Sequence, residues 1–299
     1  MRLSPLLLPA FAATALPAAP VEPVSFTGPE LQCTLTGPLL DEISGLTCSR
    51  IWPNHGWVHQ DDEGDARLYR FEASGRWRQT VTVSAVPAED WEDIASGPLP
   101  DGTPCGLFLG DFGDNEEEDR TFEIVILDER DTQRGNVVAP VAVITARHPD
   151  RPRNCEALAV SWATGDIFVL TKAGDGRSRL LRLPSAEWTQ RRGVVEAEDL
   201  GRIDLSELDT EDGLDDAYRV TGADLSPDGR LMAIRTRHFV YVYTLEGEPT
   251  AEALREPPAA VLSTASEPQG EAVAFSPGGA VILTASEQSA QVLRFSRRP

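Results

Sequence analysis

The sequence predicts an all-β fold, a five-bladed β-propeller, and three observations support this prediction. An apolar strand motif occurs five times, as ISGLTCS, WEDIASG, CEALAVS, VTGADLS and GEAVAFS. Each copy is followed 16 to 19 residues after its aligned polar position by a polar or charged residue that closes a second strand. A third strand follows every pair, and a fourth follows four of them. The repeat therefore has the four strands of a propeller blade.

Each strand of the repeat is recognised by its own residues. The second strands are WVHQD, LFLGD, FVLTK, AIRTR and LTASE. The third strands are RLYRFEA, TFEIVILDE, RLLRLP, FVYVYTL and QVLRFS. The fourth strands are RQTVTVS, PVAVITA, EAEDLGRIDL and PAAVLST. Turn residues separate the strands, as in the segments Ser226 to Gly229 and Ser276 to Gly279.

The fifth repeat predicts how the ring closes. It ends at Pro299 without a fourth strand, whereas the strand-like segment Leu31 to Gly37 precedes the first repeat. Propellers remove exposed sheet edges by letting one end of the chain complete the last blade. We therefore expect Leu31 to Gly37 to pair with the strand around Val292 to Phe295. A β-sandwich would also have many short strands, but it would not predict this missing strand.

The first residues are typical of an export signal. Arg2 is followed by an apolar run through Phe11, and Ala13 to Ala15 is a suitable cleavage site. We expect residues 1–19 to be a signal peptide and residues 20–299 to form a single β-propeller domain. This predicts a secreted protein, extracellular or periplasmic. No other segment approaches the length of a membrane span.

Four cysteines lie beyond the predicted leader, which suits an exported protein with two disulfide bonds. We expect Cys33 to pair with Cys48, because the closing strand and the first blade are neighbours. Cys105 and Cys155 lie in adjacent blades and form the second expected pair. The alternative is that some are buried thiols. No CxxC or CxH spacing supports a zinc site.

The charge excludes two classes of partner. The chain has 27 Lys and Arg against 48 Asp and Glu, a net charge of −21. Such a surface repels the phosphate backbone of nucleic acids and anionic lipid headgroups. We expect a monomer that binds a small molecule or a carbohydrate.

Several strings resemble those of a known group of proteins. DWEDIA, GDFGDN, EALAV, TGADLSPDG and QGEAVAFS are similar to motifs of uncharacterised secreted bacterial β-propeller proteins, and the likeness covers almost the whole chain after the leader. The blade layout more distantly resembles esterase-like phytase and TolB-like propellers. That resemblance implies calcium binding or action on phosphate esters. No motif here allows a catalytic residue to be carried over from those families.

Two columns of residues predict a site. The first is at the inner strand and contains Ser44, Glu92, Glu156, Thr221 and Glu271. The second closes the following strand and contains Asp61, Asp111, Lys172, Arg237 and Glu287. Two strands of about six residues joined by a turn bring the chain back to its starting end. Both columns are therefore expected at one edge of every blade, around the axis.

The residue types of these columns suggest two kinds of chemistry. The candidate catalytic residues are Glu92, Glu156, Glu271, Arg237 and Lys172. Paired carboxylates act as general acid and base, and the two cations would hold an anionic or polyhydroxyl substrate. The candidate metal ligands are Asp61, Asp111 and Glu287. Oxygen ligands alone favour calcium or magnesium over zinc, so Ca²⁺ is the cofactor to expect if the site holds a metal, and none otherwise.

Two functions remain open at this stage. One is a metal-dependent hydrolase of a phosphate ester, lactone or glycan. The other is a non-catalytic binding or scaffold propeller, in which the inner glutamates hydrogen-bond neighbouring blades and hold the ring together. Repetition of Glu in three blades favours the structural role. The absence of a GxSxG motif weakens a serine esterase hypothesis. The acidic segments 61–65, 111–115 and 209–216 are more typical of solvated loops than of metal sites.

Overall fold

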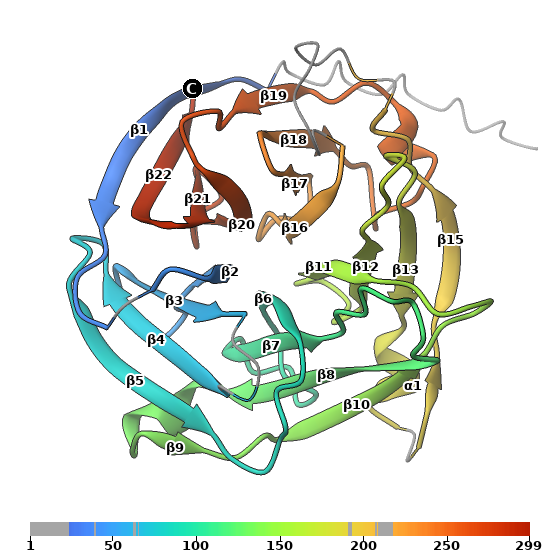
Figure 1. The fold of residues 1–299 in the computed structure, drawn as a ribbon, viewed down its shortest axis with the longest axis horizontal. Coiled ribbons are helices and arrows are strands. Elements are labelled where there is room, and N and C mark those ends of the chain that lie inside the picture. Colours follow the sequence, from blue (N-terminus) through green and yellow to red (C-terminus); the bar gives the residue numbers. More distant parts are fainter. Residues whose placement is uncertain are drawn as a thin grey trace, which may run out of the picture.

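The computed structural model describes residues 24–299 apart from 39, 62–63, 65, 191–192, 207 and 209–217. The predicted signal peptide and the acidic segment 209–216 therefore lie outside the described residues. Five sheets stand around a central axis as the blades of a propeller (Figure 1). The prediction of a five-bladed β-propeller is confirmed. No helix in the described part of the chain is long and apolar enough to cross a membrane.

Blades 1 and 2 carry more strands than the repeat predicts. From the axis outward, blade 1 consists of β2 (Ile43–Cys48), β3 (His55–Gln60), β4 (Arg67–Glu72) and β5 (Trp77–Val83). Blade 2 consists of β6 (Trp91–Gly97), β7 (Gly106–Asp111), β8 (Thr121–Asp128) and β10 (Ala142–Arg147). Each gains a fifth, parallel strand at its outer edge, β9 (Val137–Val138) on blade 1 and β14 (Val195–Glu196) on blade 2.

The other three blades have four strands each. Blade 3 consists of β11 (Cys155–Val160), β12 (Ile167–Thr171), β13 (Arg179–Leu183) and β15 (Glu198–Arg202). Blade 4 consists of β16 (Val220–Leu225), β17 (Leu231–Thr236), β18 (Phe239–Thr244) and β19 (Ala260–Ser263). Blade 5 consists of β20 (Gln269–Phe275), β21 (Val281–Glu287), β22 (Ser289–Arg297) and β1 (Phe26–Thr34). The short helices between strands are η1 (Glu129–Gln133), α1 (Ser185–Trp188) and η2 (Ala253–Arg255).

Blade 5 closes the ring as predicted. Strand β1 pairs antiparallel with β22, and Leu31 lies opposite Leu293 and Cys33 opposite Val292. The strand begins at Phe26, five residues earlier than the sequence pattern indicates. Figure 1 shows both strands, from opposite ends of the described chain, side by side in one blade. Their pairing gives β22 a partner on each side, so its edge is not exposed.

The inner strands pack against one another around the axis, and every residue of β2, β6, β11 and β16 is buried. Two buried carboxylates bind the blades together there. Asp93 accepts hydrogen bonds from the backbone amides of Leu158 at 2.8 Å and Ala223 at 3.2 Å. Asp224 accepts one from the amide of Phe275 at 2.7 Å. Because buried amides need acceptors, these contacts join blades 2, 3, 4 and 5.

One arginine spans the end of the axis at which the inner strands finish. Arg50, just after β2, donates to the Ser96 hydroxyl at 3.2 Å and the Pro277 carbonyl at 3.5 Å. Its guanidinium also lies 4.1 Å from the centroid of the Trp162 ring, a cation–π contact. These partners belong to blades 2, 5 and 3. Arg50 therefore ties four blades together at this end of the axis.

The predicted disulfide bonds are wrong. All four cysteines are free and buried. Cys33 is on the outermost strand of blade 5, whereas Cys48 is on the innermost strand of blade 1, opposite Gly56. Cys105 lies just before β7, and Cys155 lies opposite Thr171 at the other end of its blade. Neighbouring blades do not bring two cysteines together when these occupy different strands or opposite strand ends.

Candidate functional site

A cavity of about 190 Å³ lies at the axis, at the end opposite Arg50. It contains seven of the eight predicted site residues, which are Asp61, Glu92, Glu156, Lys172, Arg237, Glu271 and Glu287. The other residues that line it are Asn115, Arg219, Thr221 and Gln269. The two columns thus meet at one edge of the ring, as hairpin geometry requires.

A bulge in each blade explains why the inner column faces the cavity. The pairing between first and second strand skips one residue in all five blades. The skipped residues are Ser44, Glu92, Glu156, Thr221 and Glu271. A bulged residue leaves the ladder and its side chain is re-aimed, which is a common arrangement at functional sites. The first column is therefore a ring of bulged residues.

Three carboxylates gather at the edge of the cavity, and two of them, Asp61 and Glu92, line it. Oxygen atoms of Asp61, Asp90 and Glu92 all lie within 4.8 Å of one another. Burial, and then the charge of Asp61, raise the pKa of Asp90 to about 7. Burial first, and then the charges of Glu156 and Asp61, hold the pKa of Glu92 well above its usual value. Like charges this close need a shared proton or a cation.

Asp90 was not predicted, and the GDFGDN segment holds it in place. Its carbonyl accepts hydrogen bonds from the amides of Phe112 at 3.1 Å and Gly113 at 3.3 Å. A Cβ atom at residue 113 would lie 2.2 Å from Oδ2 of Asp90 and 2.5 Å from Oε1 of Glu92. Glycine is required here because the two carboxylates approach the backbone so closely.

Among the carboxylates that line the cavity, Glu156 has the most hydrogen-bond partners. Its Oε1 accepts from Nζ of Lys172 at 2.9 Å and from Nδ2 of Asn154 at 2.8 Å. Glu156 is 1% exposed, and burial raises its pKa. Burial lowers the pKa of Lys172, but the charge and hydrogen bond of Glu156 together with the charges of Glu271 and Glu92 outweigh this effect, so the net shift is upward. This ion pair sits in the wall of the cavity between blades 2 and 4.

Glu271 contrasts with Glu156. It is 6% exposed and lines the cavity, yet its carboxylate has no hydrogen-bond partner among the residues that the structure describes. Burial, and then the charge of Glu156, raise its pKa to about 8. A buried carboxylic acid that faces a cavity without a partner is available to a ligand.

Asp111 is the predicted ligand that the structure places elsewhere. It does not line the axial cavity, and its Oδ1 accepts from the amides of Glu89 at 3.1 Å and Asp90 at 2.8 Å. It supports the backbone that carries Asp90. Glu287, the third predicted ligand, lines the cavity and accepts a hydrogen bond from the side chain of Gln269. The geometric cluster is therefore Asp61 with Asp90 and Glu92.

Comparison with known proteins adds little about this site. No known protein-family model and no curated protein matches the chain. A solved structure, hydrazine synthase from Kuenenia stuttgartiensis, has a TM-score of 0.43 and 14% sequence identity, covering 85% of this chain and 71% of that chain. The assignment of the fold rests on the sheet topology described above.

Proposed function

We propose that this propeller binds a divalent cation in its axial cavity, and with it a small anionic or sugar-like ligand. The observation that carries the proposal is the cluster of Asp61, Asp90 and Glu92 within 4.8 Å. The unpartnered carboxylate of Glu271 in the same cavity is a second, independent indication of a ligand. The donors are all oxygen atoms, which favours Ca²⁺ or Mg²⁺.

The purely structural alternative fits these glutamates poorly. In that alternative the inner-column glutamates would bind the backbone amides of neighbouring blades. Asp93 and Asp224 make such contacts instead, one layer deeper in the ring. No backbone amide in the described part of the chain donates to the carboxylates of Glu92, Glu156 or Glu271. Glu156 is instead paired with Lys172 and Asn154, and the carboxylate of Glu271 is left for a ligand.

The cations of the cavity favour an anionic or polyhydroxyl ligand beside the metal. Lys172, Arg219 and Arg237 line it from blades 3 and 4, whereas Asp61, Glu92 and Glu287 line it from blades 1, 2 and 5. A volume of about 190 Å³ limits the enclosed part of the ligand to a small group. We propose that a ligand reaches from the cation toward Arg237.

Hydrolysis of the bound ligand is the second candidate function. Glu271 favours it, because a carboxylic acid with a pKa of about 8 is protonated at neutral pH and can donate to a leaving group. Glu156 and Lys172 form the polar wall beside it. The ligand would then be a phosphate ester, a lactone or a glycan.

Calorimetric titration with CaCl₂ and with MgCl₂, after EDTA treatment, measures binding at the cation site, and thermal denaturation measures its effect on the Tm. Saturation with the preferred ion should raise the Tm by about 5 °C at 100 times its Kd. The double variant Asp61→Asn, Glu92→Gln should lose this shift, and Asp41→Asn, an exposed neighbour, should keep it. The proposal is contradicted if neither ion changes the Tm, or if the double variant binds the ion as tightly as the unmodified protein does. Glu156→Gln then shows whether ligand binding depends on the ion pair.

A further inference from the structure

A second cavity, of about 550 Å³, lies on the same face at the edge of blade 2. It is formed by the segment before β6, the segment between β7 and β8, and His148 after β10. Eight carboxylate residues line it, and no lysine or arginine does. Asn115 lines both cavities, and Asp90 of the acid cluster lines this one, so the second cavity adjoins the axial site. Its size is within the range of small-molecule sites.

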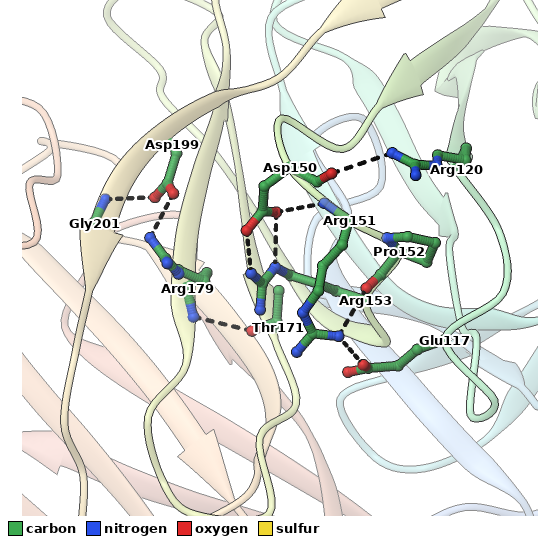
Figure 2. Close-up of polar contacts among 10 residues, drawn as sticks. All are labelled: Glu117, Arg120, Asp150, Arg151, Pro152, Arg153, Thr171, Arg179, Asp199 and Gly201. Carbon is green, nitrogen blue, oxygen red and sulfur yellow. Dashed lines mark hydrogen bonds and ion pairs between the residues drawn. The ribbon is translucent and has the colours of Figure 1, made fainter.

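The arginines nearest to this cavity do not neutralise it. Figure 2 shows Arg153 on the carboxylate of Asp150 and Arg151 on the carboxylate of Glu117. Arg120 donates to the carbonyl of Asp150 at 3.1 Å. The Arg153 contact lowers the pKa of Asp150 to about 2, so that pair is fully charged. The cavity therefore keeps a local excess of negative charge that attracts cations.

A buried imidazole is a second, independent sign of a ligand. His148 is 3% exposed and lines the cavity, and its Nδ1 has no hydrogen-bond partner in the described part of the protein. Its ring contacts Phe122 with centroids 4.9 Å apart. Burial, and then the charge of Arg153, lower the pKa of His148, so the ring is neutral at pH 7. The imidazole thus lines the cavity and carries a buried polar atom that lacks the hydrogen-bond partner such atoms usually have.

Carboxylates line the cavity from its inner to its outer side, with two phenyl rings among them. Glu89 precedes the innermost strand β6, whereas Asp119 lies just before β8 and Glu123 within it, two strands further out. Two inter-strand spacings separate these two sides by about 10 Å. Asp111, on the strand between them, already accepts hydrogen bonds from the amides of Glu89 and Asp90. Phe112 follows the same strand. The phenyl rings of Phe112 and Phe122, which both line the cavity, are 6.3 Å apart.

We propose that this cavity binds a small aliphatic polyamine, with ammonium groups on the carboxylates of its inner and outer sides and methylene groups against Phe112 and Phe122. Primary and secondary ammonium groups donate hydrogen bonds to carboxylates, which strengthens a charged contact. A quaternary ammonium ion has the charge without the N–H donors. The proposal does not depend on a cation in the axial site.

Calorimetry with spermidine at 0.15 M NaCl tests the site, with putrescine and tetramethylammonium as comparison probes. Spermidine should bind, putrescine should bind more weakly because it has one ammonium fewer, and tetramethylammonium should bind at least tenfold more weakly than spermidine. The double variant Asp119→Asn, Glu123→Gln should weaken spermidine at least tenfold with an unchanged Tm. Glu117→Gln is the matched control, since Glu117 is in the same segment but contacts Arg151 (Figure 2).

The controls separate this site from the axial one and from general attraction. Glu271→Gln, which changes a residue of the axial cavity only, should leave spermidine affinity within twofold. The proposal is overturned if spermidine does not bind, or if tetramethylammonium binds as well as spermidine. It is also overturned if Glu117→Gln costs as much affinity as the double variant, or if Glu271→Gln abolishes binding.

Discussion

Asp93 in blade 2 accepts a hydrogen bond from the backbone amide of Ala223 in blade 4, 3.2 Å away across the axis. The same oxygen accepts from the amide of Leu158 in blade 3, and the other oxygen accepts from the amide of Ile94. One side chain thus satisfies three buried amides from three blades. This contact lies directly beneath the cavity, because Asp93 follows Glu92 in the chain.

Replacing Asp93 should therefore destabilise the ring more than replacing any surface carboxylate. Asp93→Ala leaves three buried amides without their acceptor, and we expect a loss of about 3 kcal/mol in the free energy of unfolding. Urea denaturation measures it. Exposed Glu256→Ala is the control and should change stability by less than about 0.5 kcal/mol. Equal stability of the two variants would contradict the role assigned to Asp93.

The stability of the metal-free protein should fall as the pH rises. Because the pKa of Glu271 is raised from 4.5 to about 8 in the folded state, the folded protein keeps a proton that the unfolded chain loses in this window. Stability is therefore greatest below pH 4.5 for this group and decreases up to pH 8. Glu271→Gln should raise the free energy of unfolding by about 2 kcal/mol at pH 8.5 and change it little at pH 5. Urea denaturation in EDTA at both values measures this, and an equal effect at both would refute it.

Gly113→Ala should disrupt the acid cluster. The new Cβ would lie 2.2 Å from an oxygen of Asp90 and 2.5 Å from one of Glu92, so these groups must move apart. We expect a loss of about 2 kcal/mol in stability and at least tenfold weaker cation binding in calorimetry. Gly135→Ala is a matched control, since nothing lies within 4 Å of a Cβ there. If Gly113→Ala binds the cation as tightly as the unmodified protein does, the cation site does not lie at this cluster.

Four thiols should be found in each chain. Burial raises the pKa of Cys33 to about 11 and that of Cys48 to about 12, and both effects suppress the reactive thiolate. A colorimetric thiol reagent should react slowly with the native protein and titrate four groups in denaturant. If the denatured protein has only two free thiols, or none, when no reductant is added, disulfide bonds do form.

The fold was predictable because its signals are local and repeat. Each blade contains a similar apolar strand followed by a polar residue at a similar offset, and the missing last strand predicts that β1 replaces it. Strands β9 and β14 have two residues each, too few for any pattern. The wrong cysteine pairs arose because adjacency of blades was considered without the strand and the strand end on which each cysteine lies.

The site was predictable only where it follows the repeat. Seven column residues share a cavity because their positions recur in every blade, and three of them are bulged residues of the inner strands. Asp90 lies one residue before its strand, and its importance comes from Asp61 in another blade, a contact that no local pattern encodes. Asp111 has the expected position in its column, but its carboxylate accepts hydrogen bonds from nearby backbone amides and does not line the cavity.

The closure of blade 5 by β1 has a consequence for how the protein is made. Strands β1 and β22 come from opposite ends of the described chain, so their pairing closes the longest loop in the molecule. Until residues 289–297 are synthesised, β1 has no partner strand and the first four blades form an open arc. Glu271 and Glu287 join Asp61 and Glu92 only when that arc becomes a ring. The cavity is therefore complete only after the ring has closed, and a ligand that requires the whole cavity recognises only the closed ring.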